Sequence, residues 1–207
     1  MDKAIVIDNL SKKYKNNRGI EDINLEIVRG EIFGFLGPNG SGKTTTMKIM
    51  VGLMKADKGD VRINGYSISN DYEQVMKNVG CIIESVTPFP YLTAYENMKL
   101  CERFYDDVDE AKINKSLEIT GLIKYKNEKI KNYSSGMKQR LGIAIAILSN
   151  PNIMILDEPF NGLDVEGMVE MRELIIFLSK QHKTTFFISS HLIHDIELTC
   201  DKVGILY

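Results

Sequence analysis

The chain lacks the features that would mark a disulfide-rich, membrane-spanning or exported protein. Its three cysteines are an odd number without a C-x-x-C pair, so reduced, structural thiols in a cytosolic protein are expected. The apolar run at residues 141–148 is far shorter than the ~20 residues that cross a bilayer. The chain does not open with a charged segment followed by a long apolar one. Any connection to a membrane is therefore expected to come through a partner.

The sequence also carries little net charge. A formal net charge of −2 over 207 residues gives no general attraction for nucleic acid, and no nucleic-acid partner is expected. The guanine-reading sequence Asn-Lys-x-Asp does not occur, which disfavours a GTPase. The length and composition are those of one globular domain with one substantial core.

The most informative segment is glycine-rich and reads Phe-Leu-Gly-Pro-Asn-Gly-Ser-Gly-Lys-Thr-Thr at residues 35–45. It joins an apolar strand pattern at 30–36 to a helical pattern at 44–54, as a phosphate-binding loop requires. Glycines let backbone N–H groups approach an anion, and the helix N-terminus favours negative charge. Lys43 is predicted to reach the β- and γ-phosphates, and Thr44 to bind Mg²⁺. The predicted nucleotide-binding residues here are Gly37, Pro38, Asn39, Gly40, Ser41, Gly42, Lys43, Thr44 and Thr45.

A second informative segment reads Ile-Met-Ile-Leu-Asp-Glu-Pro at residues 153–159. Its apolar residues predict a buried parallel strand that delivers two carboxylates to the C-terminal edge of a sheet. Asp157 is predicted to hold Mg²⁺, and Glu158 to orient and polarise the attacking water. A strand that simply ends in polar residues at the surface is the weaker interpretation, because a phosphate loop independently requires acids at this edge.

Four other residues have both a functional and a structural interpretation. Tyr14, just before a polar turn at 16–19, either stacks on adenine or packs at a strand end. Glu84 closes the apolar run 79–84 and either helps to hold Mg²⁺ or only meets solvent. His191 follows the β-rich segment 184–190, and it either hydrogen-bonds a γ-phosphate or begins a helix that reaches about residue 199. Asp164 is the expected N-cap of a helix at 165–180.

The remaining segments predict a β-rich start and a helical insertion. Residues 4–7 and 23–27 indicate antiparallel strands, and 59–65 a strand that ends in an Asn-Gly turn. Residues 85–95 hold two prolines and several aromatic side chains, which if exposed would form a docking surface. Helices are then predicted near 94–105, 109–120 and 136–149. Taken alone, Ser134-Ser135-Gly136 before the last helix indicates only a good N-cap.

The order of these parts resembles, over the whole chain, the nucleotide-binding domain of ATP-binding-cassette (ABC) transporters. Residues 37–45 resemble its Walker A loop, 133–137 its signature motif, 153–158 its Walker B strand and catalytic glutamate, and 161–164 its D-loop. His191 and Tyr14 fall where that family has its switch histidine and its adenine-stacking aromatic residue. The resemblance implies an α/β P-loop fold with a mixed core sheet, an antiparallel β lead-in and a helical insertion that carries the signature.

Two departures from the family pattern narrow the resemblance to one group within the family. Glu84 stands where the family most often has glutamine, and residues 133–137 read Tyr-Ser-Ser-Gly-Met in place of Leu-Ser-Gly-Gly-Gln. Together with the segment 82–85, these two features resemble those of bacterial ATPases that export bacitracin-like and lantibiotic peptides or confer immunity to them. The chain ends at 203–207 inside an apolar strand where the family continues, so a longer protein is expected.

The resemblance implies a single domain at 1–207, with a core and β subdomain at 1–84 and 151–207 and a helical subdomain at 85–150. It implies ATP and Mg²⁺ as ligands, and a second copy or a paralogue stacked head to tail. Ser134 and Gly136 of each copy would then complete the phosphate site of the other, and Asp164 would lie at the same interface. It also implies a membrane-spanning permease, which places the chain at the cytoplasmic face of a bacterial membrane.

The expected function is ATP hydrolysis that powers export of antimicrobial peptides or drug-like compounds. The expected catalytic residues are Lys43, Glu158 and His191, and the expected metal ligands are Thr44, Glu84 and Asp157. A soluble cassette ATPase that acts on ribosomes or DNA would have the same motifs, although such proteins generally add a second cassette, coiled coils or basic extensions. A regulatory nucleotide-binding partner with little turnover also stays open, because the signature is altered.

Overall fold

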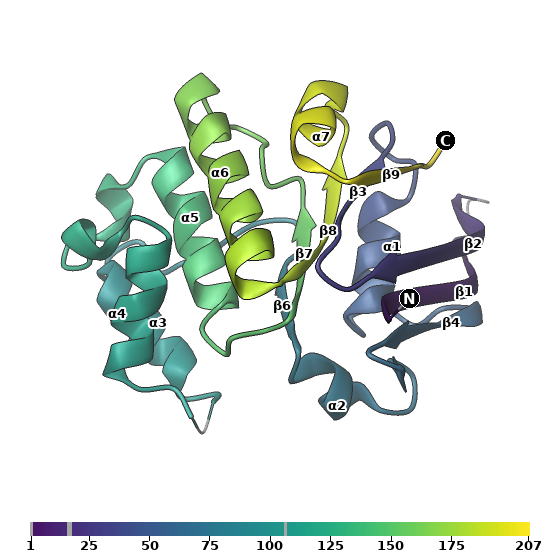
Figure 1. The fold of residues 1–207 in the computed structure, drawn as a ribbon, viewed down its shortest axis with the longest axis horizontal. Helices are drawn as coiled ribbons and strands as arrows, with labels where there is room; N and C mark the ends of the chain where they lie inside the picture. The colour runs from purple at the N-terminus through teal and green to yellow at the C-terminus, as the bar shows by residue number, and fades with distance from the viewer. Residues whose placement is uncertain (1, 16–17, 106) are drawn as a thin grey trace.

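The computed structural model describes residues 2–15, 18–105 and 107–207. Its elements form two sheets with helices between and beside them (Figure 1). The first sheet is antiparallel and has the strand order β2-β1-β4-β5. Its strands are β1 (Lys3–Lys13), β2 (Gly19–Val28), β4 (Lys58–Ile63) and β5 (Tyr66–Ser67). The predicted β lead-in is confirmed, with strands longer than the apolar runs that indicated them.

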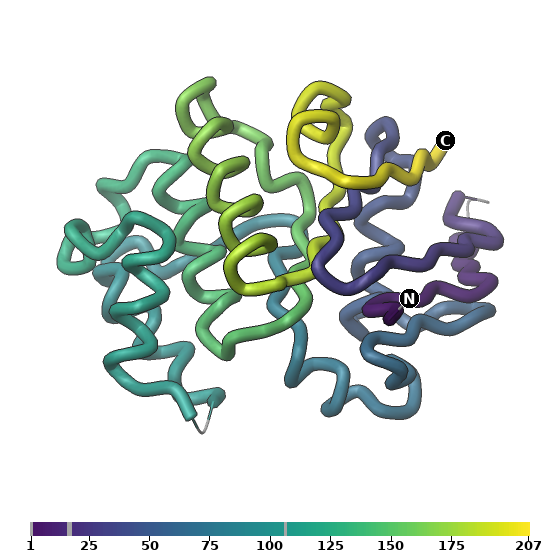
Figure 2. The backbone as a smooth tube through the Cα atoms, viewed as in Figure 1, coloured from purple at the N-terminus to yellow at the C-terminus, as the bar shows by residue number. Residues whose placement is uncertain are grey.

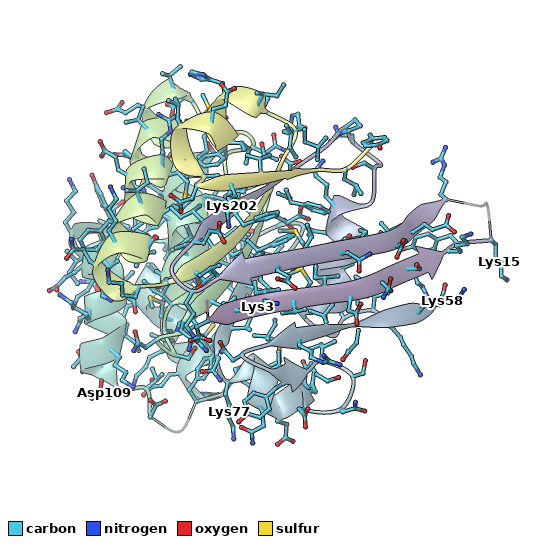
Figure 3. The ribbon with its side chains drawn as sticks, turned by 45° about the vertical axis from the view of Figure 1, so that its right-hand side comes forward. Lys3, Lys15, Lys58, Lys77, Asp109 and Lys202 are labelled. Atoms are coloured by element: carbon cyan, nitrogen blue, oxygen red, sulfur yellow. The ribbon has the colours of Figure 1, made fainter. Side chains whose placement is uncertain are left out.

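The turns of this sheet follow their sequence signals where they are described. Asn64 and Gly65 join β4 to β5 with φ of +52° and +84°, the positive values that a tight Asn-Gly hairpin turn needs. The polar turn predicted at 16–19 includes residues 16 and 17, which lie outside the described residues. Figure 3 shows Lys15 and Lys58 at the end of the sheet that is farthest from Lys3.

The second sheet is parallel and has the strand order β6-β7-β8-β3-β9. Its strands are β3 (Ile32–Leu36), β6 (Val79–Ile82), β7 (Ile153–Asp157), β8 (Thr185–Ser190) and β9 (Lys202–Ile205). Every residue of β7 and β8 is buried, as expected for parallel strands covered on both faces. The α/β class is confirmed, with parallel and antiparallel pairing divided between two sheets rather than mixed in one.

Helices cover both faces of the parallel sheet. α1 (Lys43–Met50) lies on the side of the antiparallel sheet, whereas α5 (Ser135–Ala146) and α6 (Val165–His182) lie on the opposite side (Figure 1). The short helices α2 (Tyr72–Met76) and α7 (Ile193–Thr199) precede β6 and β9. Within the described residues, no helix combines the length and the apolarity needed to span a bilayer.

The helical insertion is built from α3 (Ala94–Glu102), α4 (Glu110–Ile119), α5 and two 3₁₀ turns at Ile123–Tyr125 and Ile130–Asn132. α3 begins with the predicted capping box, in which the Thr93 hydroxyl accepts from the Glu96 N–H and the Glu96 carboxylate accepts from the Thr93 N–H. α3 ends at Glu102, a few residues earlier than its pattern predicted. α2 was not predicted from the sequence.

Three hydrophobic clusters hold these layers together. Consecutive side chains of β8 point to opposite faces, so Phe187 packs with Met47 of α1 in one cluster while Phe186 packs with Ile175 of α6 in another. The third cluster lies within the helical insertion around Met98 and Leu141. The packing fixes α1 on the sheet, and Figure 2 shows the chain turning between β3 and α1 beside the C-terminal strand.

Candidate active site

The site lies at the C-terminal edge of three neighbouring parallel strands. The register pairs Leu36 of β3 with Ser190 of β8, and Asp157 of β7 with Ser189. β8 lies between β3 and β7, so the segments that follow these two strands leave the sheet at the same edge on either side of β8, where ligands bind in open α/β sheets. The glycine-rich loop and the two acids, which are more than a hundred residues apart in the sequence, meet at this edge.

The glycines of the loop are required by its tight path. A Cβ at Gly37 would lie 2.4 Å from the Leu206 carbonyl oxygen, and one at Gly42 would lie 2.3 Å from the Ile20 side chain. Gly40 and Gly42 also have φ of +85° and +109°, which side-chain-bearing residues rarely adopt. A residue with a side chain would therefore clash or be strained at these positions, so glycine is required and the backbone of the loop stays open.

Two features of the loop fit a bound phosphate. A Cβ built at Gly40 would meet nothing within 4 Å, so the tip of the loop faces open space. The buried Ser41 hydroxyl has no hydrogen-bond partner in the described part of the chain, which is unusual for a buried polar atom. A phosphate oxygen would supply that partner. The following helix α1 adds the positive end of its dipole.

Lys43 is almost fully buried, at 5% exposure, and joins the loop to the acids. Its ammonium donates to the carbonyl oxygens of Gly37 at 2.7 Å and Pro38 at 3.3 Å. It also lies 3.3 Å from Glu158 Oε1. A buried ammonium needs such partners. The predicted phosphate-binding lysine and the predicted catalytic glutamate thus lie in direct contact.

Thr44 and Asp157 form the second contact between the loop and β7. The Thr44 hydroxyl donates to Asp157 Oδ2 at 2.9 Å, and Asp157 is 5% exposed. Hydroxyl and carboxylate oxygens are the hard ligands that Mg²⁺ prefers, with phosphates and waters completing its octahedron. The donor set at this position therefore fits a nucleotide-bound Mg²⁺.

Ser189 is a site residue that the sequence analysis placed in a strand without giving it a role. Its hydroxyl donates to Asp157 Oδ1 at 2.6 Å and accepts from the Glu158 N–H at 2.9 Å, and the residue is completely buried. The only available signal was a pair of serines at the end of a β-rich run. Ser189 therefore holds the Asp157 carboxylate and the Glu158 backbone at once.

Glu158 and His191 form a pair on the open side of the site. Glu158 Oε2 lies 2.8 Å from His191 Nδ1, and the glutamate side chain keeps 20% of its surface exposed. Glu158 has a φ of +49°, a left-handed conformation that costs a non-glycine residue about 1–3 kcal/mol. The helix after the strand begins only at Ile193, so His191 precedes it and turns its ring to the glutamate.

Glu84 touches the site through its backbone rather than its carboxylate. Its N–H donates to Asp157 Oδ2 at 3.4 Å, whereas its side chain is 64% exposed and pairs with Lys48 of α1 at 2.5 Å. The sequence analysis did not single out Lys48. The predicted metal ligands Thr44 and Asp157 are thus brought together, while the Glu84 carboxylate is directed to a lysine.

Tyr14 lies at the mouth of the site beside α1. Its hydroxyl is 3.2 Å from Thr45 Oγ1 and donates to Met54 Sδ at 3.2 Å, and 39% of the residue is exposed. The ring is therefore accessible next to the phosphate loop, where an adenine could meet it.

Ser134, Gly136 and Asp164 lie apart from the phosphate loop. Ser134 caps α5 by accepting from the Met137 N–H, and Asp164 caps α6 by accepting from the Gly167 N–H at 2.9 Å, as predicted. In the described residues none of their hydrogen bonds reaches the loop. The two caps are close to each other, because a Cβ at Gly136 would lie 3.9 Å from Leu163. Ser134 and Asp164 are both exposed.

Comparison with known proteins places this arrangement in one family. The family model described as "ABC transporter" matches residues 20–161. The chain is 42% identical over 206 residues to the ABC transporter ATP-binding protein YhcH of Bacillus subtilis, covering 100% of this chain and 68% of that protein. It therefore belongs to the ABC transporter family, as an ATP-binding domain.

Two further relatives are named for the compounds that they transport. The chain is 41% identical to the bacitracin transport ATP-binding protein of Enterococcus faecalis, covering 100% of this chain and 67% of that protein. It is 38% identical to the lantibiotic transport ATP-binding protein of Streptococcus pyogenes, covering 97% and 86%. The resemblance to this group is confirmed. The chain spans about two thirds of the length of YhcH and of the bacitracin relative.

Solved structures give the same result for the fold. The cassette cbiO1 of Clostridium perfringens, part of the transporter complex cbiONQ, superposes with a TM-score of 0.88 at 26% identity, covering 100% of this chain and 85% of that one. The cassette MJ0796, a dimer in a post-hydrolysis state with ADP and Pi, gives a TM-score of 0.85 at 26% identity, covering 98% and 94%.

Proposed function

We propose that this chain binds ATP with Mg²⁺ and hydrolyses it to drive a membrane transporter that exports antimicrobial peptides or drug-like compounds. The observation that carries the proposal is the meeting of the phosphate loop with the acids of β7, through the Lys43–Glu158 and Thr44–Asp157 contacts. Tyr14 is proposed to stack on the adenine, and the loop from Gly37 to Thr45 to hold the phosphates.

The metal would be held by Thr44 and Asp157, which already share a hydrogen bond. A Mg²⁺ ion held by these residues would supply positive charge that neutralises the charge developing on the phosphate oxygens. Ser189 keeps Asp157 in place by donating to its second oxygen. The lysine is proposed to exchange Glu158 for phosphate oxygens when the nucleotide binds, since both compete for the same ammonium.

Glu158 is proposed as the general base that takes a proton from the attacking water. Its carboxylate is partly exposed, so water can reach it, and the His191 ring orients one of its oxygens. His191 is in turn proposed to hydrogen-bond the γ-phosphate or the charge around it. With this left-handed backbone, the Glu158 carboxylate contacts both Lys43 of the loop and His191.

A second copy or a paralogue is proposed to complete the site. Ser134 and Gly136 lie at the start of α5, away from the phosphate loop of their own chain, and a helix N-terminus is suited to bind a phosphate. Head-to-tail stacking would bring them to the γ-phosphate held by the other copy, with Asp164 at the same interface. Hydrolysis then removes contacts that exist only in the closed dimer, and the dimer reopens.

A membrane-spanning permease is the proposed partner for residues 85–95, where Phe89 and Tyr91 are 61% and 75% exposed. The chain would then act at the cytoplasmic face of the membrane. Residues 85–150 are proposed as a helical subdomain that moves on a core formed by 1–84 and 151–207. The names of the bacitracin and lantibiotic relatives support the export of peptides.

Glu158→Gln tests this function. The amide keeps the shape of the side chain but cannot accept the proton, so ATP turnover is expected to fall by about a hundredfold or more while ATP binding persists. Phosphate release and equilibrium binding of ATP should be measured on the same preparation. Near-normal turnover in this variant would remove Glu158 from the proposed role.

The alternative of a soluble cassette ATPase that acts on ribosomes or nucleic acid is not favoured. The relatives of this chain are named as transport ATP-binding proteins, and its net charge is −2. Recovery of a membrane protein, rather than ribosomes or DNA, with the tagged protein would distinguish the two.

A further inference from the structure

A lysine outside the motifs lies against the site. Lys48 is four residues after Thr44 on α1, so the two side chains lie on the same face of the helix, one turn apart. Thr44 donates to Asp157, and one turn further along, Lys48 Nζ lies 2.5 Å from Glu84 Oε1. Consecutive turns of α1 therefore contact Asp157, the proposed metal ligand, and Glu84, whose N–H donates to Asp157.

The backbone of Glu84 is at that metal position although its carboxylate is not. The Glu84 N–H donates to Asp157 Oδ2, the same oxygen that accepts from Thr44. Glu84 has a φ of +68°, a left-handed conformation that a glutamate adopts only when its surroundings hold it there. The backbone contact keeps Glu84 beside Asp157, the proposed metal ligand, whichever partner its carboxylate takes.

The ion pair between Lys48 and Glu84 can be exchanged for a metal contact. Lys48 keeps 27% and Glu84 64% of its side chain exposed, and pairs in contact with water contribute little to stability. A divalent cation at the proposed metal position would attract the same carboxylate. Lys48 and the metal therefore compete for the same carboxylate.

We propose that Lys48 is a positioning residue that holds the Glu84 carboxylate outside the coordination sphere of the nucleotide-bound divalent ion. The inference rests on the proposed nucleotide function. Without the Lys48 ammonium, Glu84 becomes an additional oxygen ligand beside Thr44 and Asp157, and the site binds the divalent ion more tightly. With the lysine present, the charge of Glu84 is balanced and the ion keeps more of its water ligands.

The test measures Mn²⁺ binding, with Mn²⁺ as a paramagnetic probe for the Mg²⁺ position. The protein is kept in excess over ADP so that the nucleotide is bound, and free Mn²⁺ is counted by electron paramagnetic resonance. Lys48→Met is expected to lower the Mn²⁺ dissociation constant by about fivefold, the upper range for release of an exposed ion pair. Lys48→Arg should leave the Mn²⁺ dissociation constant at the wild-type value, because arginine keeps the positive charge.

Glu84→Gln separates the proposed competition from a general effect of charge. In the Glu84→Gln background, Lys48→Met is expected to change the Mn²⁺ dissociation constant by less than about twofold, and the difference between backgrounds is the coupling. No change in the wild-type background, weaker Mn²⁺ binding, or an equal change in both backgrounds would overturn the inference. Should Lys48→Met fail to fold, Lys48→Gln provides the same comparison.

Lys99→Met is the matched control. It removes a lysine that pairs with Glu102 at 2.6 Å on α3, in the helical insertion, and should leave Mn²⁺ binding unchanged. Measurements on the wild-type protein separate the proposed nucleotide function from the proposed role of Lys48. If it binds neither ADP nor Mn²⁺ with ADP, the proposed nucleotide function fails. If it binds both and the Lys48 variants show no coupling, only the role of Lys48 is lost.

Discussion

Ser189→Ala tests whether one buried hydroxyl holds both acids of the site. The Ser189 hydroxyl donates to Asp157 Oδ1 at 2.6 Å and accepts from the Glu158 N–H at 2.9 Å. A hydrogen bond to a charged group contributes about 1.5–3 kcal/mol, and a buried N–H left without an acceptor costs about 1–3 kcal/mol. Since the two effects share one group and are not fully additive, we expect a loss of about 3 kcal/mol in the free energy of unfolding.

The neighbouring Ser190 offers a matched control for this change. Ser189 and Ser190 are 0% and 1% exposed, and among the described residues the Ser190 hydroxyl accepts only the Leu192 N–H, at 3.0 Å. Ser190→Ala loses this neutral bond, so about 1 kcal/mol is expected. Urea unfolding followed by far-ultraviolet circular dichroism gives both values if the slopes agree. Equal losses in the two variants, or a loss below about 1 kcal/mol for Ser189→Ala, would refute the reasoning.

Two further outcomes follow from the same contacts. Lys43→Ala removes the main point charge for the triphosphate and should abolish tight nucleotide binding, which isothermal titration with MgATP would detect; retained micromolar affinity would contradict this role. Burial raises the pKa of the Cys200 thiol from 9.0 to about 12, with a smaller contribution from Asp201. At pH 8 the folded protein should therefore have about a thousandfold less thiolate at Cys200 than a free thiol has. Alkylation of Cys200 is expected to be slower by the same factor. Because this pKa is raised by folding, the stability linked to Cys200 is complete below about pH 9 and declines toward pH 12; a Cys200→Ser variant should lose that part of the alkaline decline in thermal unfolding.

Much of the site could be predicted because its residues are specified locally. The spacing of glycines before Lys43 and Thr44, and the two acids directly after an apolar strand, each carry a physical requirement that is visible in the sequence. Their meeting also follows, since parallel strands bring their C-terminal ends to one edge. The pattern predicted a helix that reaches residue 54, whereas α1 ends at Met50. The sequence did contain a signal for the earlier end, because Gly52 has a φ of +72°, as a glycine just after a helix often does.

The remaining features depend on tertiary contacts that no local pattern contains. Ser189 matters because the register places it opposite Asp157, and a serine at a strand end has no distinctive signal. The direction of the Glu84 side chain is set by Lys48, 36 residues earlier in the sequence. α2 is a single short turn of helix whose buried residue is Val75, which is too few residues for a periodic pattern.

The most direct measurement of the central claim is a crystal structure of the Glu158→Gln protein with MgATP. We expect a triphosphate in contact with Lys43, with the metal between Thr44 and Asp157. A triphosphate bound elsewhere, or a metal held by residues away from the edge of β7, would contradict it.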